Sequence, residues 1–303
     1  KSDIEIYGTG NKILKTNVKG VMTDVVDVTA FGAVPHSLDN DFQRAIDNFD
    51  AIKAAIEYAN TSTTAKIVWF PSGANGKIYY FKMPGSESFK IYPGLIYSGS
   101  TGVVLKRSSQ SHSGPFFFQT VYPSYADCVI FSGLYFDGAY PNGNRPTAAC
   151  IVYIGTEISN IDSRMIIKGC TFANWRHDST EFYAVYVVRL AYFRMKNCIF
   201  MDCGNSVNAQ DCRAVITDCD VYHNVNTVRQ GMSDIIISSG AWEVHGLFSL
   251  VSGVKFYGGV YAGRKAIAVV GDAVGLITIM NCKSRQYVLD SAAVAYSFLD
   301  VTK

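Results

Sequence analysis

The chain has 303 residues, of which 17% are charged, and its formal net charge at neutral pH is +2. Like charges form no block along it, which argues against a nucleic acid or an anionic membrane surface as a partner. No stretch approaches about 18 uncharged apolar residues, so we expect no membrane insertion. The 19 Tyr, 18 Phe and 26 Gly residues favour β-strands joined by many turns.

The beginning of the chain divides into two segments by composition. Residues 1–23 are polar apart from two short apolar alternations, and we expect them to form a leader or neck. Residues 24–303 are expected to form one domain. In it, residues 24–64 make an N-terminal cap and residues 65–303 make the repeated part of the fold.

One amphipathic helix is predicted inside the cap. Apolar residues recur there at intervals of three and four, the spacing of one helical face: Phe49, Ile52, Ile56 and Ala59. Asp47, Asn48 and Asp50 lie where the helix begins, and their oxygens suit the free N–H groups and the positive end of the helix dipole. We expect this helix to cover the exposed edge of the first strands.

A short apolar segment recurs through the rest of the chain. It reads MIIKGCTF at Met165–Phe172, with alternating apolar residues, then Gly, Asn or Asp, then usually Cys. The other copies are Val129–Phe136, Phe193–Phe200, Ala214–Val221, Leu250–Phe256 and Ile277–Ser284. We interpret each copy as a strand of a solenoid, in which every turn buries its face against its neighbours. The copies are unevenly spaced, which favours a coil with outward-bulging loops over helical repeats.

Further strands are expected around these copies. Three precede them, and five lie upstream of individual copies: Ile67–Pro71, Lys77–Lys82 and Val103–Lys106, then Cys150–Ile154, Ala184–Val188, Val207–Gln210, Ile235–Ser238 and Ala266–Val270. The predicted fold is therefore an all-β, right-handed parallel β-helix with an N-terminal capping α-helix.

Half of the eight cysteines hold one position of the repeat: Cys170, Cys198, Cys219 and Cys282. A Cys beside small polar residues within an apolar strand behaves as a small buried hydrophobic residue. No CxxC pair and no Cys/His cluster has the spacing of a zinc site, so we expect no metal and no cofactor. We predict reduced, structural thiols in a protein folded in a reducing cytosol.

Four segments near the beginning of the chain resemble one known family. Asp27–Ala33, Asp47–Ile56, Ile67–Gly73 and Gly94–Lys106 occur in the order typical of the pectate-lyase-like right-handed parallel β-helix domain of bacteriophage tailspikes. The Gly-Asp-Gly usual in that family after Phe-Gly-Ala is replaced here by Pro35–Asp41. The motif resemblance covers about the first hundred residues, and the rest of the chain resembles the family in the style of its repeat.

The resemblance implies a homotrimeric spike of a virion tail, assembled in a reducing bacterial cytoplasm and acting outside the cell. Such a spike recognises, and commonly cleaves, a bacterial surface polysaccharide such as capsule or O-antigen. We therefore predict a polysaccharide depolymerase that hydrolyses glycosidic bonds with paired carboxylates. A polysaccharide lyase on the same fold and a non-catalytic adhesin or structural spike remain the alternatives.

The first candidate site is the segment Trp175–Tyr183. We expect Asp178 and Glu181 to act as catalytic carboxylates, because hydrolysis needs two of them around the bond. The substrate-binding residues predicted in the same segment are Trp175, Arg176, His177 and Tyr183. A solvated loop with incidental charge is the simpler interpretation of this segment.

The second candidate comes from aligning the upstream strands, which places Gly155, Arg189, Asp211 and Gly271 at one turn position. Asp211 is predicted to be catalytic, and Arg189 and nearby Glu157 to bind substrate. On consecutive coils about 5 Å apart, these groups form either a catalytic floor or a surface ion-pair ladder of little energetic worth.

The third candidate is the turn after each Cys-position strand, where Asn174, Asp202 and His223 align. Asp202 is predicted to be catalytic, since neighbours there can tune its pKa, whereas a polar ladder that caps turn carbonyls is the simpler reading. Glu243, two residues from His245, is a further predicted substrate contact, or part of an outward polar face. A lyase would instead need a base and a cation, for which Arg189, Arg194, Lys196, Tyr222 and His223 are candidates.

Overall fold

A computed structural model shows how these segments fold. It describes residues 4–6, 13–18, 21–39, 46–74, 76–82, 87–107, 115–120, 128–138, 149–155, 163–175, 183–224, 233–238, 248–260, 264–271, 276–288 and 297–302. Of the predicted site residues, Glu157, Arg176, His177, Asp178, Glu181 and Glu243 lie outside these ranges.

The strands form three sheets, which we call the first, second and third sheets. The first sheet contains β1 (Ile4–Ile6), β2 (Ile13–Val18), β3 (Val21–Asp27), β4 (Ala65–Phe70), β7 (Ile96–Gly99), β10 (Cys128–Ser132), β13 (Arg164–Lys168), β16 (Tyr192–Lys196), β19 (Ala214–Thr217), β22 (Ser249–Ser252) and β25 (Ile277–Met280). The second contains β5 (Ile78–Phe81), β8 (Val104–Arg107), β11 (Tyr135–Asp137), β14 (Thr171–Ala173), β17 (Ile199–Met201), β20 (Asp220–His223), β23 (Lys255–Val260) and β26 (Lys283–Val288). The third contains β6 (Phe89–Lys90), β9 (Phe117–Thr120), β12 (Ile151–Ile154), β15 (Tyr183–Val188), β18 (Asn205–Gln210), β21 (Ser233–Ser238), β24 (Lys265–Val270) and β27 (Ser297–Thr302).

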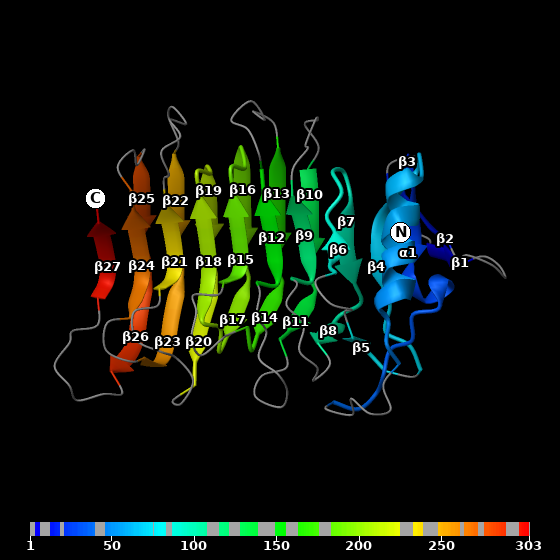
Figure 1. Ribbon diagram of the computed structural model, residues 1–303, viewed down its shortest axis with the longest axis horizontal. Helices are drawn as coiled ribbons and strands as arrows, with labels where there is room; N and C mark the ends of the chain where they lie inside the picture. The colour runs from blue at the N-terminus through cyan, green and yellow to red at the C-terminus, as the bar shows by residue number, and fades with distance from the viewer. Residues whose placement is uncertain are drawn as a thin grey trace.

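From β4 onward the chain visits the three sheets in rotation, so every strand pairs in parallel with the strand three places along the sequence. The resulting coils stack along the long axis of the molecule, with the helix at one end and the C-terminal strand at the other (Figure 1). This arrangement confirms the predicted parallel β-helix with an N-terminal helix. No helix in the described part of the chain is long and apolar enough to span a membrane.

The repeated segment differs from the prediction, because each copy is two strands and a corner and not one strand. In Met165–Phe172, β13 of the first sheet ends at Lys168 and β14 of the second sheet begins at Thr171. The residue before the Cys position has a positive φ of 53–69° in every copy: Gly133, Gly169, Asn197, Asp218, Gly253 and Asn281. Only Gly, Asn and Asp adopt this left-handed conformation at little cost, which explains the pattern Gly, Asn or Asp before Cys.

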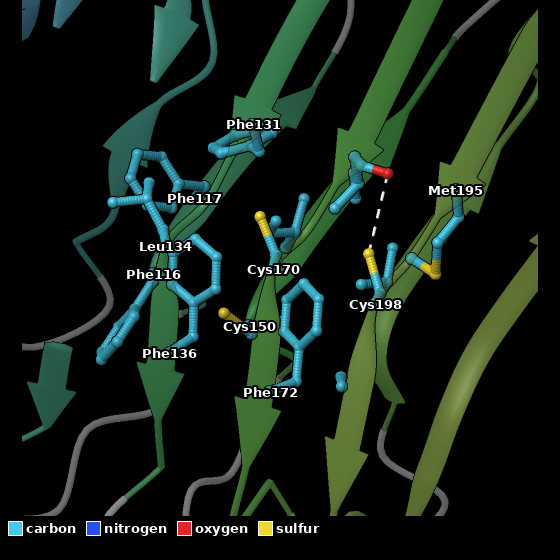
Figure 2. Packing of buried hydrophobic residues seen from close by; sticks show 14 of the residues in the cluster. Phe116, Phe117, Phe131, Leu134, Phe136, Cys150, Cys170, Phe172, Met195 and Cys198 are labelled. Atoms are coloured by element: carbon cyan, nitrogen blue, oxygen red, sulfur yellow. Dashed lines mark hydrogen bonds between the residues drawn. The ribbon is translucent and has the colours of Figure 1, made fainter. Parts of the chain in front are cut away.

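The side chains that point into the coil stack in ladders along its axis (Figure 2). Phe172 lies between Phe136 and Phe200, with ring centroids 5.1 Å apart on both sides. Cys170 and Cys198 are buried, as predicted, and the Cys198 thiol donates to the Ile167 carbonyl at 3.7 Å. Burial raises the pKa of Cys170 to about 12, so this thiol is not a nucleophile. All eight cysteines are free.

The N-terminal end is closed by a 3-10 helix, η1 (Val28–Phe31), and by α1 (Phe49–Thr61). The predicted apolar face of α1 is buried, and Phe49 stacks on Phe89 at 5.1 Å between ring centroids. Asp47 accepts a hydrogen bond from the Phe49 N–H at 3.1 Å, whereas Asn48 binds the Val34 backbone instead of the helix. The segment expected to be a leader contributes β1 and β2, which extend the first sheet by antiparallel pairing of β1 with β2 and of β2 with β3.

Candidate functional site

The outward surface of the third sheet carries a set of polar and aromatic side chains. Side chains alternate along each strand, and Val185, Val207 and Ile235 point into the core. The neighbouring positions therefore point outward, and they align on adjacent coils as two rows: Tyr186, Asn208 and Ile236, and Val188, Gln210 and Ser238. We call Tyr183, Tyr186, Asn208, Gln210 and Ser238 the outer polar face, in which Asn208 is buried and the other four side chains are partly exposed.

Hydrogen bonds between coils hold this face together. The Tyr186 hydroxyl donates to the Gln210 side-chain oxygen at 3.3 Å, and the Ser238 hydroxyl donates to the Asn208 side-chain oxygen at 3.4 Å. The rings of Tyr183 and Tyr186 stack with their centroids 5.5 Å apart. These groups stand on paired strands, so the sheet holds their positions more firmly than a loop would.

One edge of the face contains two of the predicted site residues. Arg189 and Asp211 occupy the same corner on consecutive coils, as predicted, with positive φ values of 54° and 50°. Asp211 is buried. Burial raises the pKa of Tyr186, the charge of Asp211 raises it further, and that of Arg189 opposes the shift.

Asp202 lies at the opposite end of β18. The predicted alignment of Asn174, Asp202 and His223 is confirmed by the pairing of the strands that precede them. The Asp202 carboxylate accepts hydrogen bonds from the backbone N–H and the side-chain amide of Asn224, both at 2.6 Å. The six residues of β18 separate Asp202 from Asp211 by about 20 Å, too far for the two carboxylates to act on one glycosidic bond.

Trp175, predicted to bind substrate, is instead part of the core. Its side chain is 1% exposed, its N–H donates to the Phe136 carbonyl at 3.2 Å, and its ring meets the edge of Phe116 at 4.9 Å. The Arg107 guanidinium lies 5.9 Å from its centroid. A ring enclosed on these sides has no face to offer to a sugar.

Two polar clusters did not emerge from the sequence, and the first surrounds Lys106 on the second sheet. The Lys106 ammonium lies 2.8 Å from Asp137 and 2.6 Å from Asp39, and the Asn174 amide donates to Asp137 at 2.9 Å. Burial lowers the pKa of Lys106, but the two carboxylates outweigh it and the net shift is upward. Asp137 pairs with Lys106 on one side and with Ala173 on the other, so a carboxylate and a lysine at equivalent positions of consecutive coils were the available signal.

The second cluster is entirely buried and joins His223, Asp234 and Arg264. His223 Nε2 lies 2.8 Å from an Asp234 carboxylate oxygen and 3.0 Å from the Arg264 guanidinium, which also pairs with Asp234. Burial raises the pKa of Asp234, but Arg264 and His223 lower it more, so the carboxyl is charged. With no exposed side-chain surface, this cluster cannot contact a polysaccharide.

The sites described so far include no metal centre. Within the described residues, no group of three or more His, Cys, Asp or Glu side chains is placed to hold a metal ion.

Comparisons with known proteins give weak structural similarities. No protein-family model matches the chain, and no curated protein matches its sequence. A surface adhesin of Streptococcus pneumoniae, PfbA, is 14% identical with a TM-score of 0.46, over 92% of this chain and 78% of that chain. The A-module of a mannuronan C-5 epimerase from Azotobacter vinelandii is 12% identical with a TM-score of 0.45, over 91% and 100%. The catalytic unit of an α-1,3-glucanase from Streptomyces thermodiastaticus is 12% identical with a TM-score of 0.24, over 92% and 68%.

Proposed function

We propose that this protein binds a bacterial surface polysaccharide, capsule or O-antigen, on the outer polar face and depolymerises it by hydrolysis as a homotrimeric phage tailspike. The outer polar face is the observation that carries the proposal. Tyr rings, side-chain amides and hydroxyls on a rigid surface are the groups that stack on sugar rings and exchange hydrogen bonds with sugar hydroxyls. Assembly in a reducing bacterial cytoplasm is supported by the eight free cysteines.

Hydrolysis by this site assigns Asp211 as one carboxyl group, because strand pairing puts it next to Arg189, three residues beyond Tyr186, at the edge of the face. The partner candidate is Glu157, which follows Gly155, the residue level with Arg189 on the preceding coil. Asp178 and Glu181 precede β15, whose start pairs with the start of β18, the end at which Asp202 lies. One carboxyl donates a proton to the leaving oxygen, and the other activates water or attacks the sugar. Arg189 then orients an acidic or hydroxyl group of the substrate.

A binding protein without catalysis is the second candidate. It is favoured by one observation: Asp211 is 3% exposed, and Asp202, the other predicted catalytic carboxylate that the structure describes, lies at the far end of the same strand. Such a protein would attach to the polysaccharide and leave it intact.

The test is incubation with capsule and O-antigen purified from candidate host bacteria. Defined oligosaccharides with new reducing ends are expected, while binding without new ends would assign the adhesin function. Ultraviolet absorbance from unsaturated uronates would identify a lyase. Tyr186→Ala is expected to weaken binding about tenfold or more, because it removes both the ring and its hydrogen bond. Tyr257→Ala, which removes the partly exposed ring that stacks on Tyr222 in the second sheet, is the matched control and should bind normally.

Catalysis is tested with Asp211→Asn and Glu157→Gln, which are both expected to lose cleavage with binding retained. Asp178→Asn and Glu181→Gln, in the segment that precedes β15, are expected to keep cleavage. Full activity of Asp211→Asn and Glu157→Gln would reject this assignment of the carboxyl groups.

A further inference from the structure

The outward surface of the first sheet carries a concentration of positive charge that the linear sequence conceals. Arg164 and Lys168 stand on β13, Arg194 and Lys196 on β16, and Arg213 directly precedes β19. Strand pairing places Lys168 opposite Lys196, and Arg194 opposite Ile166. We call these five cations the basic face.

Few carboxylates offset this charge. Among the described residues, Asp218 is the carboxylate that pairs with the basic face, at 3.8 Å from Lys196, and both side chains are about half exposed, which makes the pair weak. Arg213 lies 5.8 Å from the centre of the Tyr192 ring. Four of the cations, Arg164, Lys168, Arg194 and Arg213, are exposed.

Folding stability does not explain this arrangement. Like charges placed directly opposite each other on neighbouring strands destabilise a sheet, and Lys168 faces Lys196 in this way. Strands lie about 4.8 Å apart, and every second residue of a strand is about 7 Å from the last. Lys168 and Lys196 are therefore neighbours across two strands, Arg194 and Lys196 are neighbours along β16, and Arg164 lies about 14 Å from Lys168 along β13. A polyanion with charges at regular intervals relieves the repulsion.

We propose that the basic face is a second polysaccharide site, which binds an acidic polysaccharide through carboxylate groups on successive sugars. The class of ligand rests on the proposed function, but the site lies on a different sheet from the outer polar face. Half-buried Ile166 and Val215 and the Tyr192 ring lie among the cations. These apolar surfaces suit the C–H faces of sugar rings. A nucleic-acid-binding domain is typically strongly basic as a whole, and the net charge of +2 on this chain therefore argues against a nucleic-acid ligand.

Two sites on one rigid coil give the site on the third sheet an increased local concentration of polymer. When one segment of a long chain is held by the basic face, another segment reaches the outer polar face as an intramolecular event. The basic face thus retains an acidic polymer between successive encounters with the other site.

The experiment measures binding of polygalacturonate, a carboxylated polysaccharide, to the whole chain by titration calorimetry. The wild type is expected to bind, with affinity falling about tenfold between about 50 and 200 mM salt. The variant Lys168→Gln/Arg194→Gln/Lys196→Gln is expected to lose at least about tenfold in affinity. Lys90→Gln/Lys255→Gln/Lys283→Gln removes the same charge from the other two sheets and should bind as the wild type does. Dextran, which is neutral, should not compete.

Equal binding by the wild type and the basic-face variant, or tighter binding of duplex DNA than of polygalacturonate, would overturn the inference. Thermal unfolding of both triple variants shows that each is folded. Cleavage of host polysaccharide is measured separately. Normal cleavage by a wild type that does not bind polygalacturonate rejects the basic face alone. Specific loss of polygalacturonate binding in the basic-face variant, with no host polysaccharide bound or cleaved, supports the basic face and rejects the proposed function.

Discussion

The corner between the first and second sheets and the connection between the second and third sheets are built on different principles. At the first, six coils have a left-handed residue followed by an apolar side chain or Cys, which is buried in five of them and partly buried at Cys282. At the second, the polar groups change from coil to coil. Lys106, Asp137 and Asn174 interact near the N-terminal end, and His223, Asp234 and Arg264 interact further along the coil, at β20, at β21 and just before β24.

The difference separates what repeats from what is particular to one coil. A repeated corner needs only a residue that tolerates positive φ and a side chain that fills the core. Its contribution to stability is therefore spread over many weak, equivalent contacts. A buried charge cluster concentrates its energy in a few bonds, because each charge depends on one partner. Substitutions at the two places should therefore differ in size.

The largest effect is expected in the buried cluster. Asp234→Leu leaves the fully buried Arg264 guanidinium without its carboxylate and should lower the free energy of unfolding by about 3–5 kcal/mol. Chemical denaturation of the purified protein measures the loss. Adding Arg264→Met removes the stranded charge, so the double variant should be more stable than Asp234→Leu alone.

Asp220→Leu is the control for that experiment. Asp220 pairs with Lys255 at 3.7 Å at a partly exposed site on β20, and its loss should cost less than about 1 kcal/mol. Similar losses for Asp220→Leu and Asp234→Leu would show that the buried cluster has no special role.

Most of the fold was predictable because the coil repeats. Alignment of the upstream strands correctly placed Arg189 beside Asp211, and the register anchored on the Cys position correctly placed Asn174 beside Asp202, on consecutive coils. The period does not show where a strand turns, however, so Met165–Phe172 was interpreted as one strand although Gly169 bends the chain between two sheets. The apolar period shows which residues are buried. Buried positions continue around the corner, so the period alone does not show where one strand ends and the next begins.

An intermediate effect is expected at the repeated corner. Asn197 has a φ of 53° and an exposed side chain, so Asn197→Val changes the backbone preference with little change in packing. A β-branched residue in this conformation should cost about 1–2 kcal/mol in the free energy of unfolding. Asn197→Gly, which tolerates the same φ, should change stability by about 1 kcal/mol or less. If Val and Gly were equally tolerated, the left-handed residue would not be what shapes the corner.

The candidate site was less predictable than the fold, for a physical reason. Trp is a residue type that often stacks on sugars, so the sequence favoured Trp175 as a binding residue. Its exposure depends, however, on whether the first residue after a corner points inward, and the structure places its ring against Phe116. The cluster of His223, Asp234 and Arg264 joins β20, β21 and the residue that precedes β24, at separations of 11 and 30 positions in the sequence. Because these residues follow no period, alignment of the copies could identify His223 as a candidate site residue but could not identify Asp234 and Arg264 as its partners.

The smallest effect is a dependence of stability on pH that originates in the buried cluster. Burial lowers the pKa of His223 below its ordinary value of 6.5, and Arg264 lowers it further against the opposing charges of Asp234 and Asp202. Above pH 6.5 the imidazole is neutral in both the folded and the unfolded chain, so it adds no slope. As the pH falls below 6.5 the unfolded chain binds a proton that the folded chain does not, and the free energy of unfolding decreases.

This slope is at most about 1.4 kcal/mol per pH unit, the value for one proton. Denaturation midpoints of the wild type and His223→Gln, measured between about pH 7 and 5, should therefore diverge as the pH falls, with the wild type losing stability faster. The pKa of Asp234 lies below its ordinary 3.8, so its own titration falls outside this range. The remaining titrating groups contribute equally to both proteins and cancel in the difference between the two stability profiles. NMR of the His223 ring should show a neutral imidazole throughout the pH interval in which the profiles diverge. Parallel profiles would mean that His223 takes up its proton as readily in the folded coil as in the unfolded chain, and that the cluster holds no buried neutral histidine.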